Sequence, residues 1–299
     1  MKKLLFIVLV LMTNLLLAAQ NLQPFVLASV GKADYKQTIF NTKQKLTDAG
    51  FTFVGEYSPF GNNTIIITTN DDALKAAASS KRGGYIAPLR IAISQHEDEV
   101  EVSYANPLYL ENAYWIKDSM KNVDDALKLA LGFVKTFGSK KGLTPNKLKK
   151  YHYMFSMPYF DDPYEYDEYD SYEQAVGEVE KRLNIEGDAL SMVYKLDIPG
   201  TKMTVFGVQM KQTDKDDDEE DLDEQFQMSI VDFERPSKKA YFAYELLVND
   251  KEVEALHMKF RMALHFPDLP MTGKHGFTKL MSSPGEIDDA FEELIEDYR

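Results

Sequence analysis

Three side chains that can bind a metal or transfer protons lie close together in the stretch KYHYMFSMPYFDD (150–162). His152 offers an imidazole nitrogen, and Asp161 and Asp162 offer carboxylate oxygens, which are donors that zinc and related metals use. The same groups are typical general acids and bases. Their spacing matches no established metal motif. We therefore prefer to interpret the stretch as an aromatic joint with a polar rim, in which the two aspartates precede Pro163.

A second candidate site is basic and lies near the C-terminus, in HMKFRMALHF (257–266). If this segment is a strand, its even spacing places four basic residues on one face: His257, Lys259, Arg261 and His265. Apolar residues then form the other face, which predicts core. A solvated sheet face is the preferred interpretation of the basic side. The alternative is a site for an anionic ligand, with the forked guanidinium of Arg261 as donor and Arg90 as its counterpart in APLRIAIS (87–94).

Two further metal hypotheses come from methionine and from acidic residues. Thioethers and imidazoles near His152 and His257 suit Cu(I), although methionine is also a common core residue. The acidic run 214–224 fails as an EF-hand loop, because Glu219 stands where glycine is needed and Gln225 where the last glutamate belongs. We expect this run to be a disordered, solvated insertion.

Composition excludes several classes of function. The 299 residues contain no cysteine, which removes disulfides, thiolate nucleophiles, iron–sulfur clusters, haem c attachment and a lipid anchor on cysteine. A net charge of −14 disfavours nucleic acid and anionic membrane surfaces as partners. The sequence contains no nucleophile elbow, HExxH or GxGxxG motif. A catalytic triad cannot be placed from these residues.

The N-terminus reads as an export signal. Two lysines are followed by an apolar run at 4–17 and by Ala18 and Ala19. This pattern predicts a signal peptide over 1–19, cleaved after Ala19, and hence a periplasmic or secreted protein. The apolar run is too short for a membrane span of ~20 residues, and no later stretch is a candidate span.

The rest of the chain reads as two similar halves. The segments 34–50 and 171–187 both predict a capped amphipathic helix that ends at a glycine. Each is followed by a strand–turn–strand pattern. EVEVSYANP (99–107) then corresponds to KFRMALHFP (259–267), both with a two-residue period, and VDDALKLAL (123–131) corresponds to IDDAFEELI (287–295). The common order of these matches predicts a duplication.

The predicted fold is α+β, with an antiparallel sheet and helices on one face in each half. We expect a first domain over 20–142, with a short helix from about Asp71, and a second over 143–299 that carries the acidic insertion 214–224. The stretch 150–162 is too apolar for a free linker. We expect it to pack as the first strand of the second half.

Several segments also resemble a known family. FVGEYSPFGNNTIIITTNDDALKAAA, GGYIAPLRIAISQHEDEVEVSYANPLYLENAYW and KKGLTPNKLKKYHYMFSMPYFDD are similar to a secreted bacterial branch of the domain-of-unknown-function 302 family, as is YELLVNDKEVEALHMKFRMALHFPDLPM. The resemblance covers nearly all of the chain after the signal. It implies a two-layer α+β fold like that of the TATA-box-binding protein. It implies no established activity, substrate or cofactor, so no catalytic residue is transferred.

The expected function is non-enzymatic binding of a small molecule or a protein partner. Two similar halves form a natural cleft for a ligand, which aromatic rings such as Tyr153 are expected to line or close. Three alternatives remain: handling of copper or zinc in the cell envelope, acid–base catalysis by His152, Asp161 or Asp162, and a structural role in an assembly.

Overall fold

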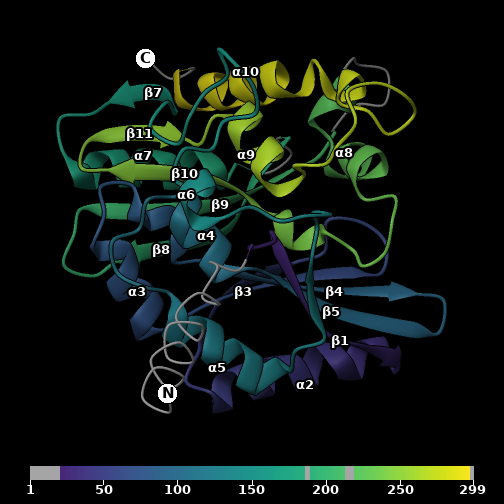
Figure 1. The fold of residues 1–299 in the computed structure, drawn as a ribbon. Helices are drawn as coiled ribbons and strands as arrows, with labels where there is room; N and C mark the ends of the chain where they lie inside the picture. The colour runs from purple at the N-terminus through teal and green to yellow at the C-terminus, as the bar shows by residue number, and fades with distance from the viewer. Residues whose placement is uncertain (1–20, 186–188, 213–218, 297–299) are drawn as a thin grey trace, which may run out of the picture.

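The computed structural model describes residues 21–185, 189–212 and 219–296, and the chain forms two antiparallel sheets flanked by helices (Figure 1). The predicted α+β fold is therefore confirmed. The predicted signal peptide lies outside the described residues, as do residues 214–218 of the acidic run. Within the described part of the chain, no helix is both long and apolar enough to cross a membrane.

The first sheet has six strands in the order β2-β3-β4-β5-β1-β6. Their bounds are β1 Phe25–Lys32, β2 Thr52–Tyr57, β3 Asn63–Thr69, β4 Leu89–His96, β5 Glu99–Ala105 and β6 Lys135–Phe137. The helices of this half are α2 Tyr35–Asp48, α3 Asp71–Ala78, η1 Gly83–Ile86, α4 Pro107–Ala113, α5 Lys121–Leu131 and α6 Pro145–Leu148. The short helix predicted from Asp71 is thus confirmed.

The second sheet has five strands in the order β7-β11-β10-β9-β8. Their bounds are β7 Tyr164–Glu168, β8 Leu190–Ile198, β9 Met203–Met210, β10 Tyr244–Asn249 and β11 Glu252–Ala255. The helices are α7 Tyr172–Leu183, η2 Glu219–Leu222, α8 Glu224–Val231, η3 Lys239–Tyr241, α9 Met258–His265, η4 Phe277–Leu280 and α10 Ser283–Glu296. Without β6, the two sheets have the same strand order. β1 lies beside β5 and β2 is at the opposite edge of the first sheet, just as β7 lies beside β11 and β8 is at the opposite edge of the second.

Local contacts repeat along with the topology. The hydroxyl of Tyr35 on α2 lies 2.7 Å from that of Thr64 on β3, and the hydroxyl of Tyr172 on α7 lies 2.6 Å from that of Thr204 on β9. Both helices begin at a side-chain N-cap, which satisfies a backbone N–H of the first turn. These repeated details agree with a duplicated unit. The boundary predicted at 142 and 143 stays a prediction.

The predicted strand at 257–266 is wrong. These residues form α9, and His257 is its N-cap, whose Nδ1 accepts from the Lys259 N–H. The counterpart of β5 is β11, because EVEV at Glu99 matches EVEA at Glu252. Nearly all of α9 is buried, so its sequence lacks the one-sided 3.6-residue period that identifies a surface helix. The alternation of large apolar side chains with other residues in this segment therefore resembles the two-residue period of a strand.

The stretch 150–162 is not a strand either, since β7 begins only at Tyr164. Pro158 interrupts it and Pro163 follows it directly, and proline cannot donate to a sheet ladder. The stretch packs in part: Phe160 is buried and stacks on Tyr114 at 5.2 Å, whereas Phe155 is 94% exposed.

The predicted insertion at 214–224 is wrong at its C-terminal end. Residues 219–222 form η2, and Glu224 is the buried first residue of α8. Asp223 caps α8 by accepting from the N–H groups of Gln225 and Phe226. The acidic run therefore extends into the start of a helix. An aspartate that caps a helix cannot be told by residue type from an aspartate in a solvated run.

The halves bury their inner faces against each other. Figure 1 shows α2 and α5 along the outer side of the first sheet and α10 along the opposite end of the molecule, beside β7. Between the sheets, η1 of the first half contacts β9 and β10, and η3 of the second half contacts β3, β4 and β5. One continuous core of buried residues spans both halves. The layer between the sheets therefore holds side chains from both.

Candidate functional site

The structure brings Arg90, Arg261 and His265 together, but in the core. All three are at most 2% exposed. Arg90 on β4 donates through Nη1 to both carboxylate oxygens of Glu245 on β10, at 3.1 and 3.2 Å. This ion pair joins the two halves. The preferred interpretation of His257, Lys259, Arg261 and His265 as a solvated basic face is therefore wrong for Arg261 and His265, which are buried, whereas His257 and Lys259 are half-buried. Arg90, Arg261 and His265 do not form an open anion site.

Arg261 is held by backbone and by rings. Its Nη2 donates to the carbonyl oxygens of Tyr241 and Ala243 at 2.6 Å each, and its guanidinium carbon lies 4.1 Å from the Tyr241 ring centre. His265 donates from Nδ1 to the Arg261 carbonyl oxygen at 2.8 Å. Burial, together with the charges of Arg90 and Arg261, holds the pKa of His265 well below its ordinary value. The imidazole is therefore neutral.

Two further ion pairs cross between the halves, and their carboxylates hold matching positions. Arg82, just before η1, donates through Nε to Glu254 on β11 at 2.8 Å. Arg235, before η3, donates through Nε to Glu101 on β5 at 2.6 Å. Glu101 and Glu254 hold the same position in the repeated EVE sequence. In both pairs, an arginine of one half donates to a glutamate of the other, so these charged residues hold the halves together.

The candidates in the joint lie apart from the buried group. His152 donates from Nδ1 to the Met154 carbonyl oxygen at 2.8 Å, and the Tyr153 hydroxyl lies 2.7 Å from the sulfur of Met271. Asp162 accepts from the backbone N–H of Tyr159 at 3.0 Å, and Asp161 is exposed. These are contacts of a folded joint. Among the described residues, no three or more His, Asp or Glu side chains are grouped so that they could hold a metal ion.

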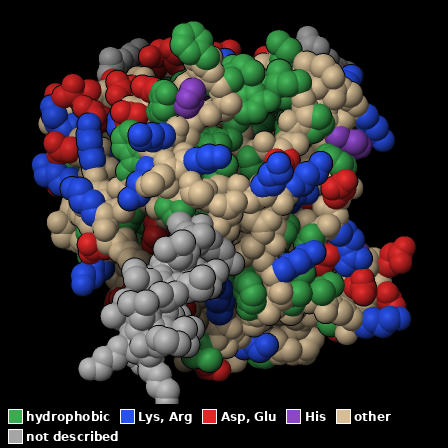
Figure 2. Space-filling model, in the orientation of Figure 1, with side chains coloured by type: hydrophobic (Ala, Val, Ile, Leu, Met, Phe, Trp, Pro, Cys, Tyr) green, Lys and Arg blue, Asp and Glu red, His purple; other side chains and the backbone are tan. Residues whose placement is uncertain are grey.

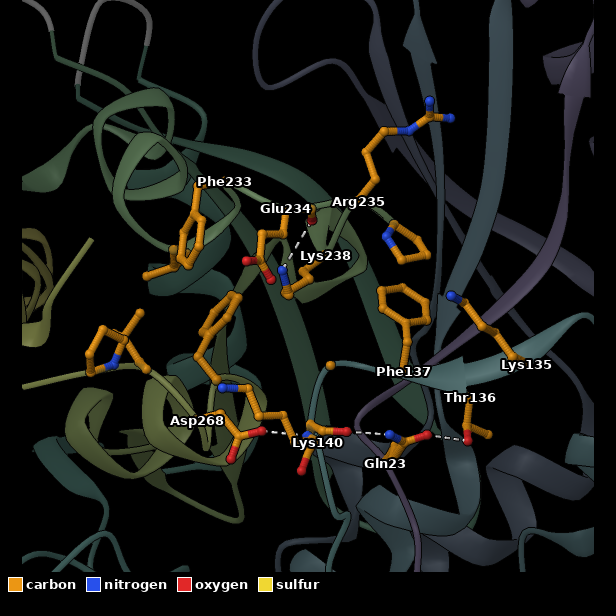
Figure 3. A pocket seen from close by; sticks show the side chains of 17 residues that line it. Gln23, Lys135, Thr136, Phe137, Lys140, Phe233, Glu234, Arg235, Lys238 and Asp268 are labelled. Atoms are coloured by element: carbon orange, nitrogen blue, oxygen red, sulfur yellow. Dashed lines mark hydrogen bonds between the residues drawn. The ribbon is translucent and has the colours of Figure 1, made fainter. Parts of the chain in front are cut away.

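An open cleft of about 500 Å³ does lie between the halves, at a place the sequence did not indicate (Figure 3). Its first wall is β6 with residues 138–140. Its second wall is the segment 231–238 between α8 and η3, and residues 266–270 after α9 close it. The aromatic residues predicted to line a cleft, at 151–160, do not reach it. The cleft is nevertheless formed between the halves, as predicted.

Aromatic rings form the apolar part of the cleft. Phe137 and Phe266 are buried in its base, each in contact with the ring of Phe25. Phe233 stands on the opposite wall, 45% exposed, and stacks on His275 with 4.2 Å between ring centres. Figure 3 shows Phe137 and Phe233 on opposite sides of the space. A flat or elongated apolar molecule would contact rings on both sides.

The charged residues of the cleft are mostly basic. Four lysines and arginines and two carboxylates line it, although the whole chain is strongly acidic. Figure 2 shows Lys and Arg side chains across the middle of this face, while acidic side chains gather at its upper left. Arg235 is committed to Glu101, and Lys238 donates to the Glu234 carbonyl oxygen at 3.3 Å. The ammonium groups of Lys135 and Lys140 form no ion pair with a described residue.

The first wall is held by hydrogen bonds to neighbouring segments. Gln23 donates to the Ser139 carbonyl oxygen and accepts from the Thr136 hydroxyl, and the Lys140 N–H donates to Asp268. These bonds hold residues 136–140 against the start of β1 and the segment after α9. The wall is therefore preformed, which lowers the entropic cost of ligand binding.

Comparison with known proteins adds little to this geometry. No protein-family model matches the chain, and no curated protein does. One solved structure is similar to part of it: the uncharacterized conserved protein DUF302 from Bacillus stearothermophilus, at 16% identity, over 36% of this chain and 93% of that chain, with a TM-score of 0.32. This likeness assigns neither membership of a family nor a function. A secreted bacterial branch stays a prediction.

Proposed function

We propose that the protein is an exported, non-enzymatic binding protein whose ligand occupies the cleft between its halves. The observation that carries the proposal is the cleft itself, with its preformed wall and its rings on two sides. Its volume of about 500 Å³ suits a small organic molecule. Export is inferred from the predicted signal peptide at 1–19.

The chemistry of the lining favours a ligand with an apolar body and a negatively charged group. Phe137, Phe233 and Phe266 supply apolar surface. Lys135 and Lys140 supply positive charge that no described carboxylate neutralises. An ammonium on a flexible stem can follow an acidic group without a fixed geometry. A carboxylate or phosphate attached to a ring or short chain satisfies both requirements.

Binding is favoured over catalysis by the composition of the lining. Among the described residues that line the cleft there is no histidine, and its carboxylates are Glu234 and Asp268. Asp268 already accepts from the Lys140 backbone N–H. No nucleophile stands beside a base in this set, whereas a catalytic site needs such a pair within hydrogen-bond reach.

Native mass spectrometry of protein purified from the cells that make it tests the proposal. We expect a bound organic molecule in the wild type. In Phe233→Ala combined with Lys140→Glu, affinity for this molecule should fall by roughly tenfold or more, because an aromatic contact and a charge are both removed. The matched control is Phe40→Ala with Lys36→Glu on α2, where Phe40 is 63% exposed.

The control should retain the ligand at wild-type affinity. Protein that carries no small molecule, or a ligand that binds the cleft variant as tightly as the wild type, would overturn the proposal. A ligand lost equally from both double variants would place the site away from the cleft.

A further inference from the structure

The innermost layer between the sheets holds more positive than negative charge. Arg90 and Arg261 are both buried, and the charge of each lowers the pKa of the same two neighbours, His265 and Tyr114. They therefore lie in one shared environment. Glu245 is the carboxylate bonded to Arg90, and it also accepts from the Tyr194 hydroxyl at 3.0 Å. Arg261 donates to carbonyl oxygens and to no carboxylate among the described residues.

The other buried acid nearby does not restore the balance. Glu224 accepts from the Tyr57 hydroxyl at 3.1 Å and from the Met210 N–H at 3.4 Å. Burial raises the pKa of Glu224 to about 8, so it is mostly a neutral acid at pH 7. Two guanidinium charges thus share the single charge of Glu245. Such a surplus is unfavourable among buried side chains.

Several donors of the same group also lack partners. Within the described part of the chain, four buried guanidinium nitrogens form no hydrogen bond: Nε and Nη2 of Arg90, and Nε and Nη1 of Arg261. Buried polar groups are nearly always satisfied, and those that are not call for a bound water or ion. A water would supply an acceptor but no charge. An anion supplies both.

We propose that a small inorganic anion of the halide class binds in the buried layer between Arg90 and Arg261. It accepts hydrogen bonds from guanidinium nitrogens that lack a hydrogen-bond partner, with the Tyr114 hydroxyl beside Arg90, and it offsets the surplus positive charge. A spherical halide requires no particular arrangement of donors and is small enough for an enclosed position. This site is separate from the cleft and does not depend on the function proposed for it.

A crystal of the full chain after its signal, grown or soaked in sodium bromide, tests the site directly. We expect an anomalous bromide peak within hydrogen-bond distance of Arg90 and Arg261 nitrogens. Water at that position, or side chains packed against each other without a peak, would overturn the proposal.

A solution measurement adds an independent test. The midpoint of thermal unfolding should rise with bromide or chloride, by roughly 2 °C or more, relative to gluconate at equal ionic strength. Arg261→Met should abolish the difference. Arg82→Met is the matched control, since it removes another buried arginine at the same interface but should keep the halide dependence. If Arg261→Met does not fold, the bromide crystal of the wild type still decides.

Discussion

The two halves share a strand order and a set of ties, but within the described residues only the first carries a sixth strand. That strand, β6, pairs with β1 and places Phe137 opposite Phe25 at the base of the cleft. At the corresponding edge of the second sheet, α10 lies beside β7 instead. The repeated elements hold the halves together. The element without a repeat builds the candidate site.

We expect the repeated contacts to contribute to stability and the contacts without a repeat to contribute to ligand binding. Arg82 with Glu254 and Arg235 with Glu101 are equivalent pairs that cross the interface in opposite directions. The cleft, by contrast, combines β6 of one half with the segment 231–238 of the other, for which the first half offers no equivalent wall. Variants of the repeated contacts should therefore lower stability, and variants of the cleft should lower affinity.

The largest effect is expected where the equivalent ion pairs differ in burial. Glu254→Gln leaves Arg82, which is 9% exposed, with only the more distant carboxylate of Glu165 at 3.8 Å, and should cost about 3 kcal/mol of unfolding free energy. Glu101→Gln should cost only about 1 kcal/mol, because the side chain of Arg235 is 45% exposed and can be hydrated. Urea denaturation measures both. Equal losses would show that the two pairs are not distinguished by burial.

A second comparison concerns the first residues of α8 and α3. Glu224 is buried with a pKa of about 8, against an unfolded value of about 4.3, whereas Asp71 is exposed. The proton of Glu224 stabilises the folded state fully below the unfolded pKa, and this contribution is lost as pH rises towards 8. Relative to Glu224→Gln, the wild type should lose about 1 kcal/mol per pH unit between those values.

Asp71→Asn is the control for this pH comparison, and its stability should run parallel to that of the wild type. Unfolding free energies measured at several pH values test it. Parallel curves for the wild type and Glu224→Gln would mean that Glu224 is ionised in the folded protein.

A third comparison concerns the size of the paired side chains between β2 and β3 in the first half and between β8 and β9 in the second. Gly55 on β2 pairs with Ile67, whereas Tyr194 on β8 pairs with Gly207. A Cβ at Gly207 would overlap the Tyr194 ring, so Gly207→Ala should destabilise by about 1–3 kcal/mol. Gly31→Ala on β1 is the control, since nothing lies near its added methyl group. Similar stabilities of the two variants in urea would contradict the packing described here.

The smallest effects are expected from the repeated hydroxyl pairs. Tyr35→Phe and Tyr172→Phe each remove one partly buried hydrogen bond, to Thr64 and Thr204. Each should cost about 1 kcal/mol of unfolding free energy. Agreement between the two losses would support equivalent roles in the halves. A clear difference would show that one copy has changed its role.

Short-range signals allowed much of the fold to be predicted. The caps of α2 and α7 are set by Asp34 and Ser171, which lie next to the helices they begin, and β5 shows a clean two-residue period. The segment of α9 was misread because a helix buried on nearly all sides carries no such period. Matching EVEV at Glu99 to EVEA at Glu252 would have placed it correctly.

The cleft could not be predicted from local sequence patterns, because segments that are far apart in the sequence line it. Phe137 and Phe233 are far apart in the sequence and meet only because the halves pack against each other. The basic residues near them, at 135–141 and 235–239, were a possible signal, since such clusters are unusual in so acidic a chain. His152, Asp161 and Asp162 attracted attention by residue type, whereas two of these three form contacts within their own joint.

The most direct test of the central claim is a crystal structure of the protein purified from the cells that make it, without added ligand. We predict ordered density for an organic molecule in the cleft, with its apolar part against Phe137 and Phe233 and an acidic group near Lys135 or Lys140. A cleft that contains only water would contradict the claim. Native mass spectrometry of the same protein then shows whether a small molecule is bound elsewhere or not at all.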